Sequence, residues 1–446
     1  MDESLKQYIE LYNSHAPLID SHSSDAINSM RHKAAHRLAS MTLPPKGAEN
    51  YETVSLSELL APDYGINVAR LPFDVNPAVS FKCGVPHLST SLFLLVNDRW
   101  AESEHGRDLL PEGVEIGSLR DYTARSEDAA AAYGSLADID NPVVALNTML
   151  AQDGMYMRIR KGVRLERPLQ LVNILSGAVP MMAVRRLLII VEEDAKGELL
   201  ICDHTQNPDV ALMSLQTIEI SVGRNARFEL YDLEESSAAT TRLSALYARQ
   251  QEGSTLLIDG MTLFNGTTRN EYYSRFDGPH ATLDLLGMGI EDADRRLDSY
   301  TYVDHAVGHC TTRELFKYVV DDRATGNFTG RIHVAPGAVG TEASQTNRNM
   351  VGSDTARMYS KPQLEIYNDD VKCSHGSAVG QLDPMQVFYM RSRGLSEEEA
   401  RLLLKQAFMA DVIDGVRMER LKDRLQHLVE RRFAGELASC SSCGLC

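Results

Sequence analysis

The stretch TIEISVGRNARFEL, residues 217–230, contains the repeating pattern that decides the fold. Apolar and polar side chains alternate up to the turn at Gly223 to Asn225, and the alternation resumes after it. A period of two places successive side chains on opposite faces of an extended chain, which is typical of a half-buried β-strand. The apolar positions are Ile218, Ile220, Val222, Ala226, Phe228 and Leu230.

Strands of this kind follow one another from about residue 155 to 375, with almost no helical interruption. Turn-forming glycines recur through the region at a loosely constant spacing, at positions 197, 223, 253, 278 and 308. Such a repeat indicates a solenoid, in which each unit buries its apolar face by stacking on the next. A two-sheet sandwich is the alternative, but a single sandwich of this length would be unusually large. We therefore expect a β-helix.

Helical patterns flank this β region on both sides. Near the start, apolar residues recur at helical spacing after Ser24, which can cap a helix, and a few strands such as 92–96 follow. Near the end, Ser396 and Glu399 form a capping-box pattern ahead of one amphipathic helix, and a second follows Gly415. We predict three units: an α-rich N-terminal domain (1–150), a β-helix core (151–384) and a small C-terminal helical domain (385–446).

Composition argues against several classes of function. The net charge of −17 disfavours nucleic acid, because affinity for nucleic acid depends on neutralising phosphates. No run approaches the ~20 apolar residues of a membrane helix, and the N-terminus lacks the pattern of a signal peptide, so we expect a cytoplasmic protein without a membrane partner. The sequence contains no Gly-Lys dipeptide and hence no P-loop, so the chain is not expected to hydrolyse ATP by itself.

The stretch NDDVKCSHGSAVGQLD, residues 368–383, carries the candidate chemistry. On an extended chain Cys373 and His375 project to the same side, roughly 7 Å apart. Thiolate and imidazole suit iron, iron–sulfur clusters and zinc, but two ligands do not complete a site. The pair is therefore interpreted as a half-site that other residues or a partner chain would complete. Two other interpretations stay open: a purely structural pair, and a Cys–His catalytic dyad.

Several long stretches resemble one family. The segment from Pro362 to Asp383, followed by FYMRSRGLSEEEARLLLKQAF at 388–408, resembles the C-terminal signature of the SufB/SufD family of the SUF iron–sulfur cluster assembly system. The SufD-type branch fits better than the SufB-type branch. Residues 143–175 and 344–367 resemble the same family, so the likeness covers nearly the whole chain.

The resemblance implies a right-handed parallel β-helix and a scaffold subunit that is not itself an enzyme. Such subunits pair with a SufB-type paralogue through the β-helix ends, and their helical domain binds a SufC-type ATPase, which supplies ATP hydrolysis. A homodimer stays open when the partners are missing. Cys373 and His375 would then contribute to an iron or iron–sulfur cluster site at the interface between subunits. The residues expected to dock the ATPase are Phe388, Arg391 and Arg393.

Three features remain open at this point. A flavin is associated with the assembled complex in the family, but no motif in this chain locates it. The tail CSSCGLC places Cys440, Cys443 and Cys446 at the spacing of the first three ligands of a ferredoxin cluster, and a metal-binding tail and incidental thiols are equally open. The main alternative function is a stand-alone homodimeric β-helix enzyme of unknown substrate.

Overall fold

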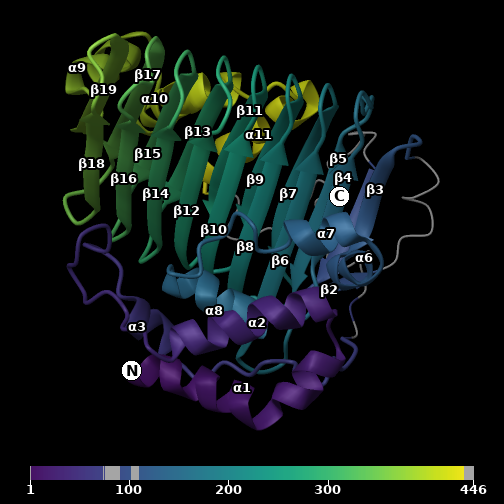
Figure 1. The fold of residues 1–446 in the computed structure, drawn as a ribbon. Helices are drawn as coiled ribbons and strands as arrows, with labels where there is room; N and C mark the ends of the chain where they lie inside the picture. The colour runs from purple at the N-terminus through teal and green to yellow at the C-terminus, as the bar shows by residue number, and fades with distance from the viewer. Residues whose placement is uncertain (1, 74, 76–90, 102–109, 436–446) are drawn as a thin grey trace.

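The computed structural model describes residues 2–73, 75, 91–101 and 110–435. Its centre is a coil of strands that alternate between two sheets (Figure 1), so neighbours within a sheet are usually two strands apart in the chain. Pairing is parallel throughout the coil, from β4 and β5 onward. The β-helix predicted from the alternation is confirmed.

The two sheets are named sheet A and sheet B. The strands of sheet A are β3 (Val114–Ser118), β4 (Met155–Ile159), β6 (Met181–Val191), β8 (Leu212–Val222), β10 (Thr240–Gln250), β12 (Thr267–Phe276), β14 (Arg296–His305), β16 (Thr325–Val334) and β18 (Arg357–Ile366). The strands of sheet B are β1 (Ser91–Val96), β2 (Arg99–Ala101), β5 (Leu169–Leu175), β7 (Lys196–Thr205), β9 (Arg227–Glu235), β11 (Thr255–Phe264), β13 (Thr282–Glu291), β15 (Thr311–Val320), β17 (Thr341–Val351) and β19 (Val371–Gly380).

Apolar side chains fill the space between the sheets. The strict register places apolar residues of successive coils above one another: Leu230 pairs with Ile258, and Ile258 pairs with Leu285. All three are buried in the largest apolar cluster of the molecule. One strand cannot bury this face alone, so the stability of each coil depends on the coils above and below it.

One corner of the coil is built from residues with a left-handed backbone. Asp194, Asn225, Gly253, His280 and His309 occupy equivalent positions in successive coils, and all have positive φ values. The N–H of Asp194 donates to the carbonyl of Arg224 in the next coil at 2.9 Å, and Asn225 donates likewise to Glu252 at 2.8 Å. Only Gly253 among these five residues is a glycine, but Gly223, Gly278 and Gly308 lie one or two residues before Asn225, His280 and His309. The repeated glycines therefore mark this corner, except Gly197, which lies within β7.

The N-terminal helices cover the outer face of sheet A (Figure 1). As expected, Ser24 caps a helix, accepting a hydrogen bond from the N–H of Ile27. Asn141 and Pro142 begin the helix that packs directly on the sheet, through an N-cap and a proline in the first turn. These helices are α1 (Glu3–Ser21), α2 (Asp25–Leu38), α3 (Leu56–Leu60), α6 (Leu119–Arg125), α7 (Glu127–Ala132) and α8 (Pro142–Leu150).

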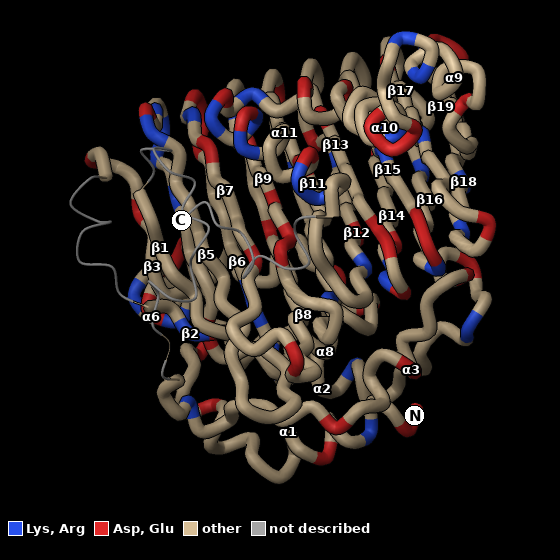
Figure 2. Tube along the Cα trace, turned by 180° about the vertical axis from the view of Figure 1, so that it is seen from behind, with Lys and Arg blue, Asp and Glu red and all other residues tan. Residues whose placement is uncertain are grey.

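The C-terminal helices lie on the outer face of sheet B, as Figure 2 shows from behind. The capping box of Ser396 and Glu399 is present. The basic residues here are not simply solvated: Arg432 is buried, donates to the carbonyl of Leu263 at 3.0 Å and pairs with Asp292. The helices are α9 (Pro384–Ser392), α10 (Glu397–Asp414) and α11 (Glu419–Phe433).

The β-helix extends further toward the N-terminus than the strand run after residue 150. Strand β1 pairs in parallel with β5 and thereby continues sheet B. The division into domains at residues 150 and 384 stays a proposal. In the part of the chain that the structure describes, no helix is both long and apolar enough to cross a membrane.

Candidate functional site

The β-helix ends at β18 and β19, the terminal strands of sheets A and B. Each therefore presents one edge with no strand beside it among the described residues. A single extended segment through this region would place Asp369 on the same face as Cys373. Instead the chain leaves β18 after Ile366 and bends at Asp369 before β19 begins at Val371. Asp369 thus belongs to the corner between the two sheets.

Within β19, Cys373 and His375 occupy alternate positions and share one side of the strand. Cys373 pairs in register with Ala343, and His375 pairs with Gln345, both on β17. Ala343 and Gln345 are buried inside the β-helix. Half-buried Cys373 packs on the end of the interior core, whereas His375 is exposed. The two side chains therefore continue the interior rows at the open end of the stack.

The Cys373 thiol is not activated by its surroundings in this chain. Burial raises its pKa, and a backbone hydrogen bond at Ala343 offsets this only in part. A thiol with a raised pKa is a weak nucleophile, which disfavours a catalytic dyad, although a metal ion would still displace its proton. Among the described residues, no group of three or more His, Cys, Asp or Glu side chains could hold a metal ion. Cys373 and His375 thus bring two side chains of metal-ligating type to this end of the β-helix, without a third from the described residues.

A polar network behind the site joins the last three strands. Ser377 and Ser360 lie 2.6 Å apart across β19 and β18. The Ser360 hydroxyl also donates to Oδ1 of Asn347 on β17 at 2.6 Å. This network was missed by sequence reasoning, although the alternation of β19 places Ser377 on the same side as His375. Its hydrogen bonds hold the end of the β-helix in a defined shape.

The predicted docking residues lie on and after α9. Phe388 is 66% exposed, and the neighbouring Met385 and Tyr389 are also exposed. Arg391 lies 3.4 Å from Glu397, and Arg393 donates to the Tyr389 hydroxyl at 3.2 Å. These two arginines therefore flank an exposed apolar surface made by Met385, Phe388 and Tyr389, here called the α9 patch.

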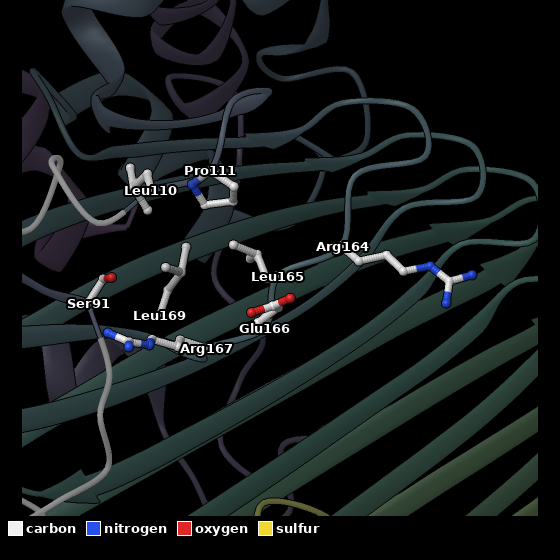
Figure 3. Close-up of a pocket in the computed structure, with 8 residues that line it drawn as sticks. All are labelled: Ser91, Leu110, Pro111, Arg164, Leu165, Glu166, Arg167 and Leu169. Carbon is white, nitrogen blue, oxygen red and sulfur yellow. The ribbon is translucent and has the colours of Figure 1, made fainter.

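A separate pocket of about 550 Å³ lies near the start of the β-helix, far along the stack from His375. Glu166 lies between Leu165 and Arg167, and Arg164 points away from the pocket (Figure 3). The pocket is open and its charged side chains are not buried, so its residues do not converge on a bound group. The remaining lining residues are Ser91, Leu110, Pro111 and Leu169.

Only some of the other cysteines lie among the described residues. Cys440, Cys443 and Cys446 lie outside the described residues. Cys310 is buried in the interior core, and its thiol donates to the carbonyl of Gly278 at 3.4 Å.

Comparison with known proteins gives a consistent result. A family model described as SUF system FeS cluster assembly, SufBD core domain, matches residues 173–408, and one described as SufBD protein N-terminal region matches residues 2–171. An iron–sulfur cluster assembly SufBD family protein of Synechocystis sp. is 28% identical over 411 residues, covering 90% of each chain. The iron–sulfur cluster assembly protein SufD of Escherichia coli is 29% identical over 65% of this chain and 69% of its own length. The SufD protein of Bacillus subtilis is 28% identical over 66% of this chain and 67% of its own length.

Proposed function

Because the chain belongs to the SufBD family, we propose that it is a scaffold subunit of an iron–sulfur cluster assembly complex and not a free-standing enzyme. The observation that carries the proposal is the incomplete ligand pair of Cys373 and His375 at the open end of the β-helix. Iron or a nascent cluster is the cargo of such a site, and a second subunit supplies the missing ligands.

The second subunit is a β-helix paralogue of the SufB type, docked at the end of the stack. The open edges of β18 and β19 invite strand pairing, since their backbone N–H and C=O groups lack partner strands. Exposed apolar side chains surround these edges, as expected at a surface that a protein partner covers. They are Tyr359, Ile366, Tyr367 and Val379. The same surface would support a homodimer when the paralogue is missing.

The α9 patch is the dock for an ATPase subunit of the SufC type. The partner would bury its apolar side chains at the centre of the interface. Arg391 and Arg393 at the rim would fix the orientation of the partner through polar contacts. ATP hydrolysis in the partner accounts for a chain without a P-loop. A flavin in the complex stays a prediction from the resemblance.

The proposal is tested by co-expressing the chain with its ATPase and paralogue partners and measuring iron and acid-labile sulfide in the purified complex. We expect His375→Ala to lower cluster content roughly tenfold or more, because one ligand is lost. Ser374→Ala is the matched control, since Ser374 is adjacent but on the opposite side of β19. The variant chains must co-purify with their partners to the wild-type extent.

The rival is a homodimeric β-helix enzyme with its own substrate. A chain that binds neither partner, or a complex with full cluster content after His375→Ala, would contradict the scaffold function. Turnover of a small molecule by the isolated chain would favour the rival.

A further inference from the structure

Glu314, Gln345 and His375 form a polar file inside the end of the β-helix. They occupy one row of sheet B, because Glu314 pairs with Gln345 and Gln345 pairs with His375 in strict register. Earlier in the row stand Leu230, Ile258 and Leu285. The row is thus apolar from Leu169 through Leu285 and becomes polar in its last three coils, which end at the candidate site.

The two inner members of the file are buried but not fully hydrogen-bonded. Glu314 is 2% exposed and Gln345 is 1% exposed. The Gln345 amide Nε2 donates to Oε2 of Glu314 at 2.7 Å, and the Thr301 hydroxyl donates to the same oxygen at 3.2 Å. Among the described residues, Gln345 Oε1 has no hydrogen-bond partner. A buried carbonyl oxygen without a donor is costly, so the site favours a group that donates to it.

Space for Gln345 is made by a glycine on the opposite sheet. A Cβ atom at Gly330 would lie 2.4 Å from Gln345 Nε2. The Gln345 amide therefore extends across the interior toward sheet A. Any other residue at position 330 would displace it. Its position is built into the fold and does not depend on a flexible surface contact.

The orientation of the amide follows from the charge of Glu314. An ionised carboxylate only accepts hydrogen bonds, so the amide must turn its Nε2 toward Glu314 and its Oε1 away. Burial raises the pKa of Glu314 to about 7, and the group is therefore ionised at pH 8. The next residue along the file is His375, on a strand that lies about 4.8 Å from the strand of Gln345 by the usual spacing of paired strands.

We infer that Gln345, held in one orientation by Glu314, is a positioning residue: the exposed ring of His375 turns inward, one ring nitrogen donates to the partnerless Gln345 Oε1, and the other ring nitrogen stays free for a ligand. A neutral imidazole carries one N–H, so an acceptor at one nitrogen selects the tautomer and exposes the lone pair of the other. The inference rests on the proposed function, because it states how the His375 half-site is prepared for iron or a cluster.

The inference is tested by measuring the tautomer of the His375 ring. The full chain is labelled with ¹⁵N-histidine, and ring ¹H–¹⁵N correlation spectra are recorded at pH 8. His375→Ala assigns the signal, and His36, an exposed histidine of α2, is the internal reference. In the wild-type chain we expect one tautomer of His375 to predominate. The ratio of the two tautomers should therefore differ from the ratio for His36. Gln345→Leu, which keeps the volume but removes the acceptor, should return His375 to the reference population.

A second variant separates positioning from packing. Exchanging the pair, by Glu314→Gln together with Gln345→Glu, keeps one carboxylate and one amide and still offers an oxygen to His375. This exchange should restore the single tautomer, whereas Glu314→Gln alone should give a mixture, because the amide is no longer fixed. A His375 ring that already matches His36 in the wild type, or that is unchanged by Gln345→Leu, overturns the inference.

The two proposals fail in distinguishable ways. If Gln345→Leu changes the tautomer but His375→Ala leaves the cluster content of the complex intact, the positioning stands and the scaffold function fails. If His375→Ala abolishes cluster content while the tautomer ignores Gln345, the scaffold function stands and the positioning is wrong.

Discussion

Lys317 Nζ lies 2.6 Å from Asp411 Oδ2 and joins sheet B to α10. The two partners are not equivalent, because the lysine side chain is 3% exposed and the aspartate side chain 60% exposed. Lys317 Nζ also donates to the carbonyl of Phe408 at 2.7 Å. The buried ammonium therefore holds the C-terminal helices, which carry the α9 patch, against the β-helix.

Lys317→Met is expected to destabilise the chain by about 1–3 kcal/mol, since the Phe408 carbonyl loses a charged donor in a partly buried place. Asp411→Asn should cost less than about 1 kcal/mol, because its carboxylate is exposed. Urea unfolding of both variants measures the difference. Equal losses in the two variants would show that the pair acts as an ordinary surface ion pair.

Asp259 should make the stability of the chain depend on pH. It is buried between sheet B and the C-terminal helices, and among the described residues neither of its oxygens has a hydrogen-bond partner. Burial alone raises its pKa from 3.8 to about 7. The folded state therefore binds this proton more tightly than the unfolded state, and stability falls as pH rises from about 3.8 to 7 and then levels off.

Asp259→Asn removes this dependence. The free energy of unfolding of the variant minus that of wild type should rise by an amount on the order of 4 kcal/mol from pH 4 to pH 8. Urea unfolding at both pH values gives the difference, in which other titrating groups cancel. Asp294→Asn is the control: a hydrogen bond from Arg323 lowers the pKa of that exposed carboxyl below its usual 3.8, so its titration lies below this pH window and the variant should follow the wild-type profile. A parallel pH profile for Asp259→Asn and wild type would contradict the prediction.

Asn225 tests the corner of the coil. Its φ of 56° is one that a β-branched residue adopts only with strain. We expect Asn225→Val to cost about 2 kcal/mol more than Asn225→Gly, which relieves the backbone. Thermal unfolding measures both. Arg224→Val at the same turn is the control and should be nearly neutral, since its ion pair with Glu193 is exposed. Equal stability of the valine and glycine variants at position 225 would argue against a strained corner.

Phe388 tests the α9 patch. Phe388→Asp should weaken binding of the ATPase subunit by about 2 kcal/mol or more, roughly 30-fold, because a charge replaces an exposed apolar anchor. Titration of the purified partner with the variant chain measures the affinity. Val179→Asp is the matched control, since Val179 is equally exposed, at 64%, but lies in the connection between β5 and β6. Unchanged affinity for the Phe388 variant would move the dock elsewhere.

Some features of the site could be predicted from the sequence because they are local. Cys373 and His375 lie on one side of β19 through the geometry of an extended chain. The same geometry does not place Asp369 in a corner. The turn-forming residues Asn368, Asp369 and Asp370 do mark the bend, and the Asn368 side chain accepts a hydrogen bond from the N–H of Asp370 at 2.9 Å. Helical periodicity likewise does not show that Arg432 is buried, because a basic residue on an amphipathic helix is usually solvated. In the folded chain the carbonyl of Leu263 and the carboxylate of Asp292 accept from its guanidinium group.

By itself, the sequence determined that the chain folds as a β-helix with helices at both ends, because alternation and helical periodicity depend only on neighbouring residues. It also determined that Cys373 and His375 form a pair. Only the tertiary structure decided what lies beneath that pair. Glu314, Gln345 and His375 are about 30 residues apart in the chain, and they share a row only because every coil between them has the length that keeps the strands in register. Register is a property of the whole stack, so no local pattern contains it.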